Sequence, residues 1–93
     1  MTITTEMIEQ VVDSLGDSFD SHKVFLELAH KNQRAYVEAL QCTDSDTPFN
    51  TLHLSLGKLV KEVCIARGFV EGTSYSNDIF LHKSKCASWS RTQ

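Results

Sequence analysis

The sequence predicts a mainly α fold of the α+β class, in which three to four helices precede a C-terminal two-stranded β-hairpin. Two observations indicate this fold. Apolar residues recur every three or four positions through most of the first two thirds of the chain, as on one side of a helix. After Gly68 this spacing stops, and short apolar runs alternate with turn-forming residues. The 93 residues suit one domain, so we expect a single unit over residues 1–93.

The helices are predicted at about residues 5–15, 21–30, 33–41 and 51–66. Thr4 is a suitable N-cap for the first helix, and Gly16 suits the left-handed backbone that often ends a helix. Asp20 is the predicted N-cap of the second helix, where Phe19 and Val24 have the spacing of a hydrophobic staple. Local signals therefore define the first two helices.

The boundary between the second and third helices stays open. Asn32 either ends one helix and begins the next, or a single helix runs from Ser21 to Leu40, because no Gly or Pro forbids it. Turn formers over residues 42–48 predict a loop before the last helix. In that helix, expected from Asn50 to Arg67, one apolar stripe is predicted to face the core: Leu52, Leu56, Leu59, Val60 and Val63.

The hairpin is predicted at about residues 69–82. Phe69-Val70 and Ile79-Phe80-Leu81 read as short strands, and the turn-forming residues 72–77 read as the loop between them. The remaining tail is small, polar and basic. We expect Trp89 to pack back on the helices with its N–H hydrogen-bonded, and so to pin the tail.

Charge is divided unevenly along the chain. Residues 1–50 hold nine acidic and three basic residues, a net charge of −6, whereas residues 51–93 hold three acidic and six basic residues, a net charge of +3. A cationic C-terminal part is a possible anion-binding surface. The cations that the fourth helix and the tail contribute to it are Lys58, Lys61, Lys83, Lys85 and Arg91.

Residue patterns of catalysis and metal binding are absent from the sequence. Asp20, Ser21 and His22 are adjacent, and adjacent helical side chains point about 100° apart, so they cannot form a linear catalytic relay. The histidine and cysteine spacings fit no structural zinc site, and no glycine loop suits a phosphate. We expect no enzyme activity, no cofactor and no metal. Three cysteines without a secretory signal or an apolar membrane span favour a cytoplasmic protein.

The order of predicted elements resembles the winged helix-turn-helix class over residues 5 to about 85. The resemblance implies that the fourth helix is a recognition helix and that residues 72–77 form the wing. Asn50 and Thr51 in its first turn would then read base edges, and Lys58 would contact guanine or phosphate. Together with the other basic residues, this defines a candidate site for duplex DNA.

Two functional hypotheses follow. The first is a small non-catalytic interaction domain that binds a protein partner, which includes self-association. Its basis is a set of apolar residues that do not belong to the predicted core-facing stripes of the helices, and that could form an exposed patch: Leu26, Val37, Leu54 and Ile65. The alternative is a nucleic-acid-binding regulatory domain, although a sequence pI near 5.7 is low for that class. Neither hypothesis implies a membrane or a small-molecule substrate.

Overall fold

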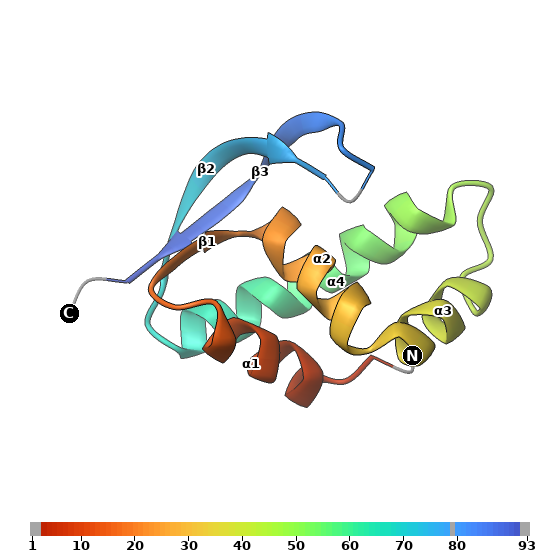
Figure 1. The fold of residues 1–93 in the computed structure, drawn as a ribbon, viewed down its shortest axis with the longest axis horizontal. Coiled ribbons are helices and arrows are strands. Elements are labelled where there is room, and N and C mark those ends of the chain that lie inside the picture. Colours follow the sequence, from red (N-terminus) through yellow and green to blue (C-terminus); the bar gives the residue numbers. More distant parts are fainter. Residues whose placement is uncertain (1–2, 79, 92–93) are drawn as a thin grey trace.

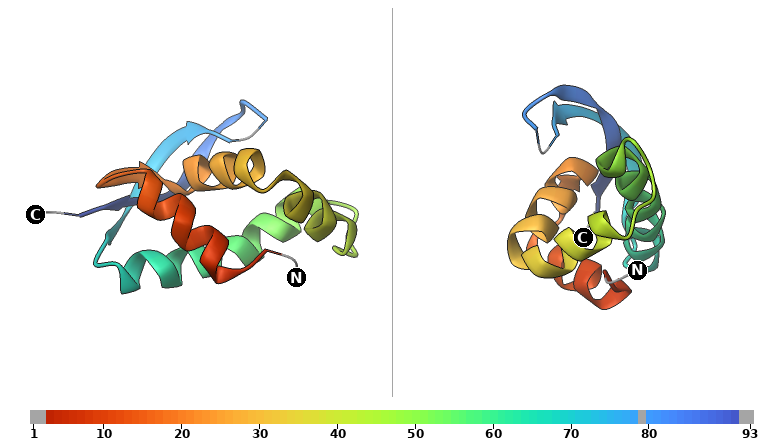
Figure 2. Two further views of the ribbon diagram at one scale, coloured as in Figure 1. Left: turned by 60° about the horizontal axis from the view of Figure 1, so that its bottom comes forward. Right: turned by 90° about the vertical axis from the view of Figure 1, so that its right-hand side faces the viewer.

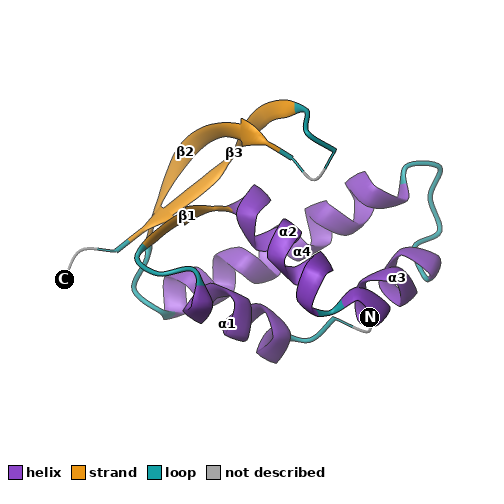
Figure 3. Ribbon diagram, in the orientation of Figure 1, coloured by secondary structure: helices purple, strands orange, loops and turns teal. Residues whose placement is uncertain are grey.

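The computed structural model describes residues 3–78 and 80–91, which form four helices and three strands (Figure 1). The helices are α1 (Thr5–Ser14), α2 (Ser21–Lys31), α3 (Gln33–Gln41) and α4 (Pro48–Ala66). The strands are β1 (Ser18–Asp20), β2 (Val70–Asn77) and β3 (Lys83–Ser90). The strands lie together on one side of the helices (Figure 3). The β2–β3 hairpin extends from this sheet and curves over the start of α2 (Figures 1 and 2).

The α+β class agrees with the structure, but the predicted two-stranded hairpin is wrong. The antiparallel sheet has three strands in the order β1-β3-β2, and Phe19 of β1 lies opposite Trp89 of β3. The sequence predicts the residues around Phe19 only as the cap and staple of a helix. A strand of three residues is too short to show an alternating pattern, and its pairing partner is about seventy residues away.

The hairpin strands also lie outside their predicted positions. Residues 72–77, predicted as a loop, belong to β2, and the polar tail forms β3 in a register from Val70 opposite Ser90 to Asn77 opposite Lys83. The chain turns instead after Asp78, whose carboxylate accepts hydrogen bonds from the amides of Phe80 and His82. Ile79, predicted in the second strand, lies outside the described residues. Backbone pairing satisfies the polar groups of these serine-rich segments, although their side chains resemble those of loops.

The helices begin and end at recognisable signals. Thr4 accepts a hydrogen bond from the amide of Met7, and Asp20 accepts one from the amide of Lys23, 2.9 Å away. Asn32 has a φ of −129° and a ψ of 53°, which interrupts the helical backbone, so α2 and α3 are two helices. α4 begins at Pro48, earlier than predicted, because the fixed φ of proline suits the first turn of a helix.

The hydrophobic core joins the helices to the base of the sheet. Trp89 is only 1% exposed, and its indole N–H donates to the Ser21 hydroxyl over 3.1 Å. Phe19 and Phe69 pack edge to face nearby, with ring centres 5.0 Å apart. The fully buried helical residues are Ile8, Val11, Val12, Val24, Leu28, Leu56, Val60 and Cys64. The base of the hairpin is thus fixed by the same core that holds the helices together.

Candidate functional site

Exposed apolar side chains gather on α4 and the hairpin. Among the described residues, seven large hydrophobic side chains are exposed, and all but Val37 of α3 belong to these two elements or to the hairpin turn. The six are Leu54, Ile65, Val70, Tyr75, Phe80 and Leu81. α4 and β2 adjoin at the base of the hairpin, where Lys61 and Glu71 form an ion pair at 3.5 Å. This unequal distribution makes α4 and the hairpin the candidate surface.

The outward side of α4 carries a line of side chains, here called the outer stripe: Leu54, Lys58, Lys61 and Ile65. Their spacing of four, three and four residues places them on one side of the helix. All four are exposed, Leu54 to 73% and Ile65 to 56%. The buried leucines and valines of α4 lie on its other side. α4 therefore presents apolar groups both to the core and to its surroundings.

The structure brings several of the candidate nucleic-acid residues to this surface. Lys58 and Lys61 belong to the outer stripe. Lys85 lines a cavity of about 480 Å³ together with Asn50 and Leu54, so β3 faces the first turns of α4 there. Lys83 is exposed next to the hairpin turn, opposite Asn77. These lysines thus belong to α4 and to the hairpin, and the shared cavity brings Lys85 next to the first turns of α4.

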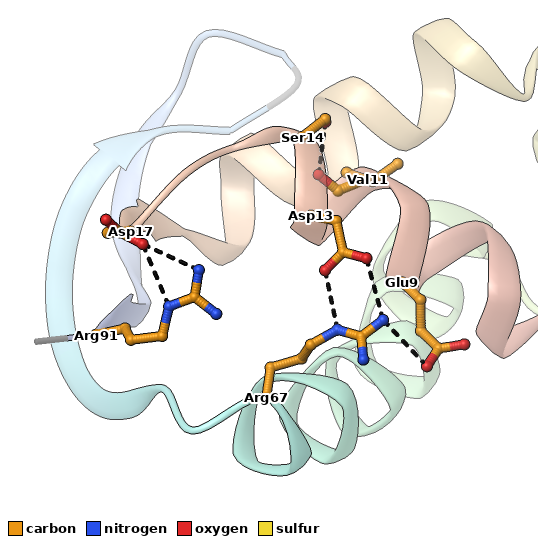
Figure 4. A network of polar contacts seen from close by, with 7 residues as sticks. All are labelled: Glu9, Val11, Asp13, Ser14, Asp17, Arg67 and Arg91. Carbon is orange, nitrogen blue, oxygen red and sulfur yellow. Dashed lines mark hydrogen bonds and ion pairs between the residues drawn. The ribbon is translucent and has the colours of Figure 1, made fainter. Parts of the chain in front are cut away.

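Arg91 and Thr51 are engaged in contacts of their own. The Arg91 guanidinium donates to Asp17 over 3.0 Å (Figure 4). It also lies 4.6 Å from the centre of the Phe69 ring. It thereby ties the end of β3 to the segment between α1 and β1. The Thr51 hydroxyl donates to Ser45 in the preceding loop, over 2.9 Å. Both contacts favour a structural role for these two side chains.

A second arginine links the oppositely charged halves of the chain. The Arg67 Nε lies 2.9 Å from the Asp13 carboxylate, and its Nη2 lies 3.4 Å from that of Glu9, so the end of α4 is bound to α1 (Figure 4). Arg67, Arg91 and Lys61 are thus paired with carboxylates. Within residues 3–78 and 80–91, Lys58, Lys83 and Lys85 form no ion pair. The cationic surface is therefore smaller than the sequence suggests.

A polar cluster under the hairpin was missed by sequence reasoning. His22 Nδ1 lies 2.8 Å from the Ser76 hydroxyl and Nε2 lies 3.2 Å from the Ser84 hydroxyl, so the first turn of α2 contacts both hairpin strands. Ser76 and Ser84 are opposite each other in the register. The Cys86 thiol lies 3.9 Å from the Ser76 hydroxyl. No local signal could reveal this cluster, since more than fifty residues separate His22 from each serine.

Beside this cluster, His53 of α4 stacks on Phe25 with ring centres 4.6 Å apart, and its Nε2 is hydrogen-bonded to the Tyr36 hydroxyl. Burial lowers the pKa of His53, His22 lowers it further, and Asp78 opposes the shift. Burial raises the pKa of Tyr36 to about 12. Both groups are therefore neutral near pH 7, and their arrangement suits a packed structural contact between α2, α3 and α4.

In the part of the chain that the structure describes, no three or more His, Cys, Asp or Glu side chains are grouped so as to hold a metal ion. None of the described helices combines the length and the apolar character that crossing a bilayer requires.

Comparison with known proteins gives no match, whether by family model, by curated sequence or by solved structure. The resemblance to the winged helix-turn-helix class therefore stays a prediction. Function is therefore inferred from the surface formed by the outer stripe of α4 and the hairpin beside it.

Proposed function

We propose that the protein is a non-catalytic interaction domain that binds a protein partner through the outer stripe of α4 and the adjoining hairpin. The observation that carries this proposal is the exposure of Leu54 and Ile65, at 73% and 56%, on a helix whose other side already fills the core. Gathered apolar side chains with polar neighbours are typical of protein interfaces.

Covering these side chains is favourable in free energy. Burial of a leucine or isoleucine side chain contributes about 1.5–3 kcal/mol relative to leaving it in water. Tyr75, which lies opposite Lys85 on the hairpin, adds an aromatic group of a kind enriched at interfaces. Aromatic and aliphatic anchors with charged neighbours of both signs thus supply both binding energy and a polar rim.

A photo-crosslinking experiment tests the proposal. A benzophenone amino acid replaces Leu54 in the protein expressed in its native cells, and in a matched protein it replaces Val37, which is also an exposed apolar residue of a helix. We expect a specific adduct from position 54 that Ile65→Glu abolishes, and none from position 37. Equal adducts from both positions, or no adduct from position 54, would contradict the proposal.

A second candidate function, binding of duplex DNA, is favoured by one observation. Lys85 faces Asn50 across a shared cavity, and neither Lys85 nor Lys58 is paired with a carboxylate among the described residues. Titration into labelled duplex DNA at low and moderate salt tests this function. Micromolar binding that weakens steeply with salt, and weakens again in Lys58→Ala combined with Lys85→Ala, would support it. Absence of binding at low salt would eliminate it.

A further inference from the structure

The outer edge of β2 offers a second contact surface, which is formed by the backbone of the hairpin. We propose that β2 pairs antiparallel with β2 of a second copy of this chain, about a two-fold axis that passes beside Ser74. This inference goes beyond the proposed function, because it needs no contact of Leu54 or Ile65. The two proposals can therefore fail independently.

The backbone groups that β2 presents at this edge follow from two hydrogen bonds. The amide of Arg91 donates to the carbonyl of Asp17, so the odd-numbered residues of β3 direct their N–H and C=O groups toward β1. The even-numbered residues of β3 then direct theirs toward β2, and the bond from the Asp78 amide to the His82 carbonyl continues this pattern. The residues of β2 whose backbone groups point away from β3 are therefore the odd-numbered ones: Glu71, Thr73, Tyr75 and Asn77.

This edge is open to a further strand. All four of its outward residues are exposed, and within residues 3–78 and 80–91 none of them makes a backbone hydrogen bond outside the sheet. β2 lies at the margin of the sheet, with β3 between it and β1 (Figure 1). Soluble proteins usually block such edges with lysines, prolines, bulges or very short strands. β1 has only three residues, whereas β2 has eight in an unbroken register, with no lysine and no proline.

A second copy of β2 complements the edge in one register. When Ser74 lies opposite Ser74 of the second copy, Glu71 of each copy lies opposite Asn77 of the other, and Thr73 lies opposite Tyr75. Every outward residue then belongs to a pair that exchanges two hydrogen bonds. A shift by two residues in either direction leaves one outward residue of each copy without a partner in β2. The register centred on Ser74 is therefore the one that uses the whole edge.

The side chains of this register also suit each other. Directly opposite residues lie on the same face of a sheet, so the Asn77 amide of one copy can donate to the Glu71 carboxylate of the other. Thr73 and Tyr75 form a cross-strand pair of a β-branched and an aromatic residue, a kind of pair that stabilises antiparallel sheets. The half-buried Ser74 residues at the centre are small enough to lie side by side.

The charges at each end of the pairing are complementary between two copies. Lys83 lies beside Asn77 in the sheet and forms no ion pair within the described residues. In the paired sheet Lys83, Asn77 and Glu71 of the second copy form one row, which brings the lysine within reach of that carboxylate. The other charges near this end are Asp78 of the first copy and Lys61 of the second, which is ion-paired with its own Glu71. Two charges of each sign therefore meet, and no like charges lie directly opposite.

Sedimentation velocity of the full-length protein, between about 1 and 500 µM, tests the pairing. We expect a reversible monomer–dimer equilibrium in the micromolar range, as suits a small interface. Thr73→Pro removes an outward N–H at an edge strand, where proline is tolerated, and should raise the dissociation constant at least tenfold. The control Thr73→Val keeps this N–H and the branched shape, and should change the dissociation constant less than twofold. Far-UV circular dichroism checks that each variant is folded.

Two charged variants test whether the occupant is a second copy, and they leave the backbone intact. Thr73→Lys with Tyr75→Lys places lysines opposite lysines in a homodimer, and Thr73→Glu with Tyr75→Glu does the same with glutamates. Each variant alone should be monomeric, whereas an equimolar mixture should dimerise, because opposite charges then face each other. Amide hydrogen exchange reports on the edge itself. With rising concentration of the native protein, exchange at Thr73 and Tyr75 should slow far more than exchange at Ser74, whose amide points toward β3.

The possible failures are separable. A protein that stays monomeric up to about 500 µM would overturn the second copy as the occupant of this edge. A dimer that Thr73→Pro leaves intact and Ile65→Glu disrupts would place the contact on the outer stripe, which overturns this inference and leaves the proposed function standing. Monomeric behaviour of the mixed charged variants would contradict the antiparallel register. The proposed function is judged by the adduct from position 54, which the pairing of β2 does not require.

Discussion

The two ends of the β2–β3 hairpin are held in different ways. At the base, Trp89 is 1% exposed and bonded to Ser21, and Phe69 packs against Phe19. Toward the turn, His22 contacts serines of both strands, and Phe80 packs edge to face on Phe49 with ring centres 4.8 Å apart. One pair of strands thus changes along its length from a core element to a polar, exposed one.

This difference predicts how firmly each part of the hairpin is held by the rest of the protein. Segments with few buried apolar contacts open locally at a lower free energy than the core. The base should therefore open only when the whole protein unfolds, whereas the outer part should open by itself. Changes at the two ends are expected to differ in size and in the range over which they act.

The largest effect is expected from Trp89→Ala. Loss of this buried indole leaves a cavity where β1, β3 and α2 meet, and should lower the free energy of unfolding by about 3–5 kcal/mol. Urea unfolding followed by circular dichroism measures this. Trp89→Phe, which keeps a ring but loses the hydrogen bond to Ser21, should lower the free energy of unfolding by less than Trp89→Ala does. If Trp89→Ala lowered the free energy of unfolding by less than about 1 kcal/mol, the base of the hairpin would not be the core element described above.

An intermediate effect is expected from alkaline pH acting on Tyr36. Burial raises the pKa of Tyr36 from 10.0 to about 12, so between these values the folded state holds a proton that the unfolded chain releases. Stability must then fall as the pH rises through this range. In Tyr36→Phe, the free energy of unfolding that is lost between pH 9 and pH 11.5 should be smaller by roughly 2 kcal/mol. Urea unfolding at each pH measures this difference.

Cys64 acts in the same direction, because burial raises its pKa to about 11. It is present in both proteins, so its contribution cancels in their difference. Parallel pH profiles for native protein and Tyr36→Phe would show that the Tyr36 environment does not resist ionisation.

A smaller and more local effect is expected from His22→Ala. The substitution removes the contacts to Ser76 and Ser84 and should cost about 1 kcal/mol in local stability. Amide hydrogen exchange in the outer part of β2 and β3 should become about fivefold faster, while the amides near Trp89 change little. Equal acceleration at both ends would mean that the hairpin opens as one unit.

The smallest effect is expected from Phe80→Ala. The edge-to-face contact with Phe49 contributes about 0.5–1 kcal/mol, and Phe80 is half exposed in the folded protein. The urea midpoint should barely move, whereas NMR signals of the turn and of Phe49 should shift. A large fall in global stability would contradict the view that the turn is only locally held.

Local residue patterns were enough to find the helices, because caps and apolar spacing lie within a few positions of each other. They failed for the sheet, because β1 pairs with residues about seventy positions away, and the serines of β2 and β3 resemble those of loops. For the candidate site, the sequence singled out Leu54, Ile65 and Val37 as apolar residues that the core does not use, and all three are exposed. Leu26, grouped with them, is half-buried.

The engagement of Arg91 with Asp17 lay beyond sequence reasoning for the same reason. The two residues are 74 positions apart, and only the folded chain brings the end of β3 to the segment after α1. Ion pairs such as this one join the acidic first half of the chain to the basic second half, so part of the charge of each half is neutralised within the molecule. A count of basic residues overstated the cationic surface.

The underside of the hairpin has one further consequence. Its side chains over α2 include the hydroxyls of Ser74, Ser76 and Ser88, which line a hollow of about 510 Å³ shared with His22. Hydroxyl groups are hydrated as readily as they bond to an imidazole. When the outer part of the hairpin lifts, water can replace the contacts of these hydroxyls, whereas the contact between the Phe80 and Phe49 rings is lost without replacement. A raised hairpin would therefore present hydroxyl groups along its strands and the newly exposed rings of Phe49 and Phe80 at its turn.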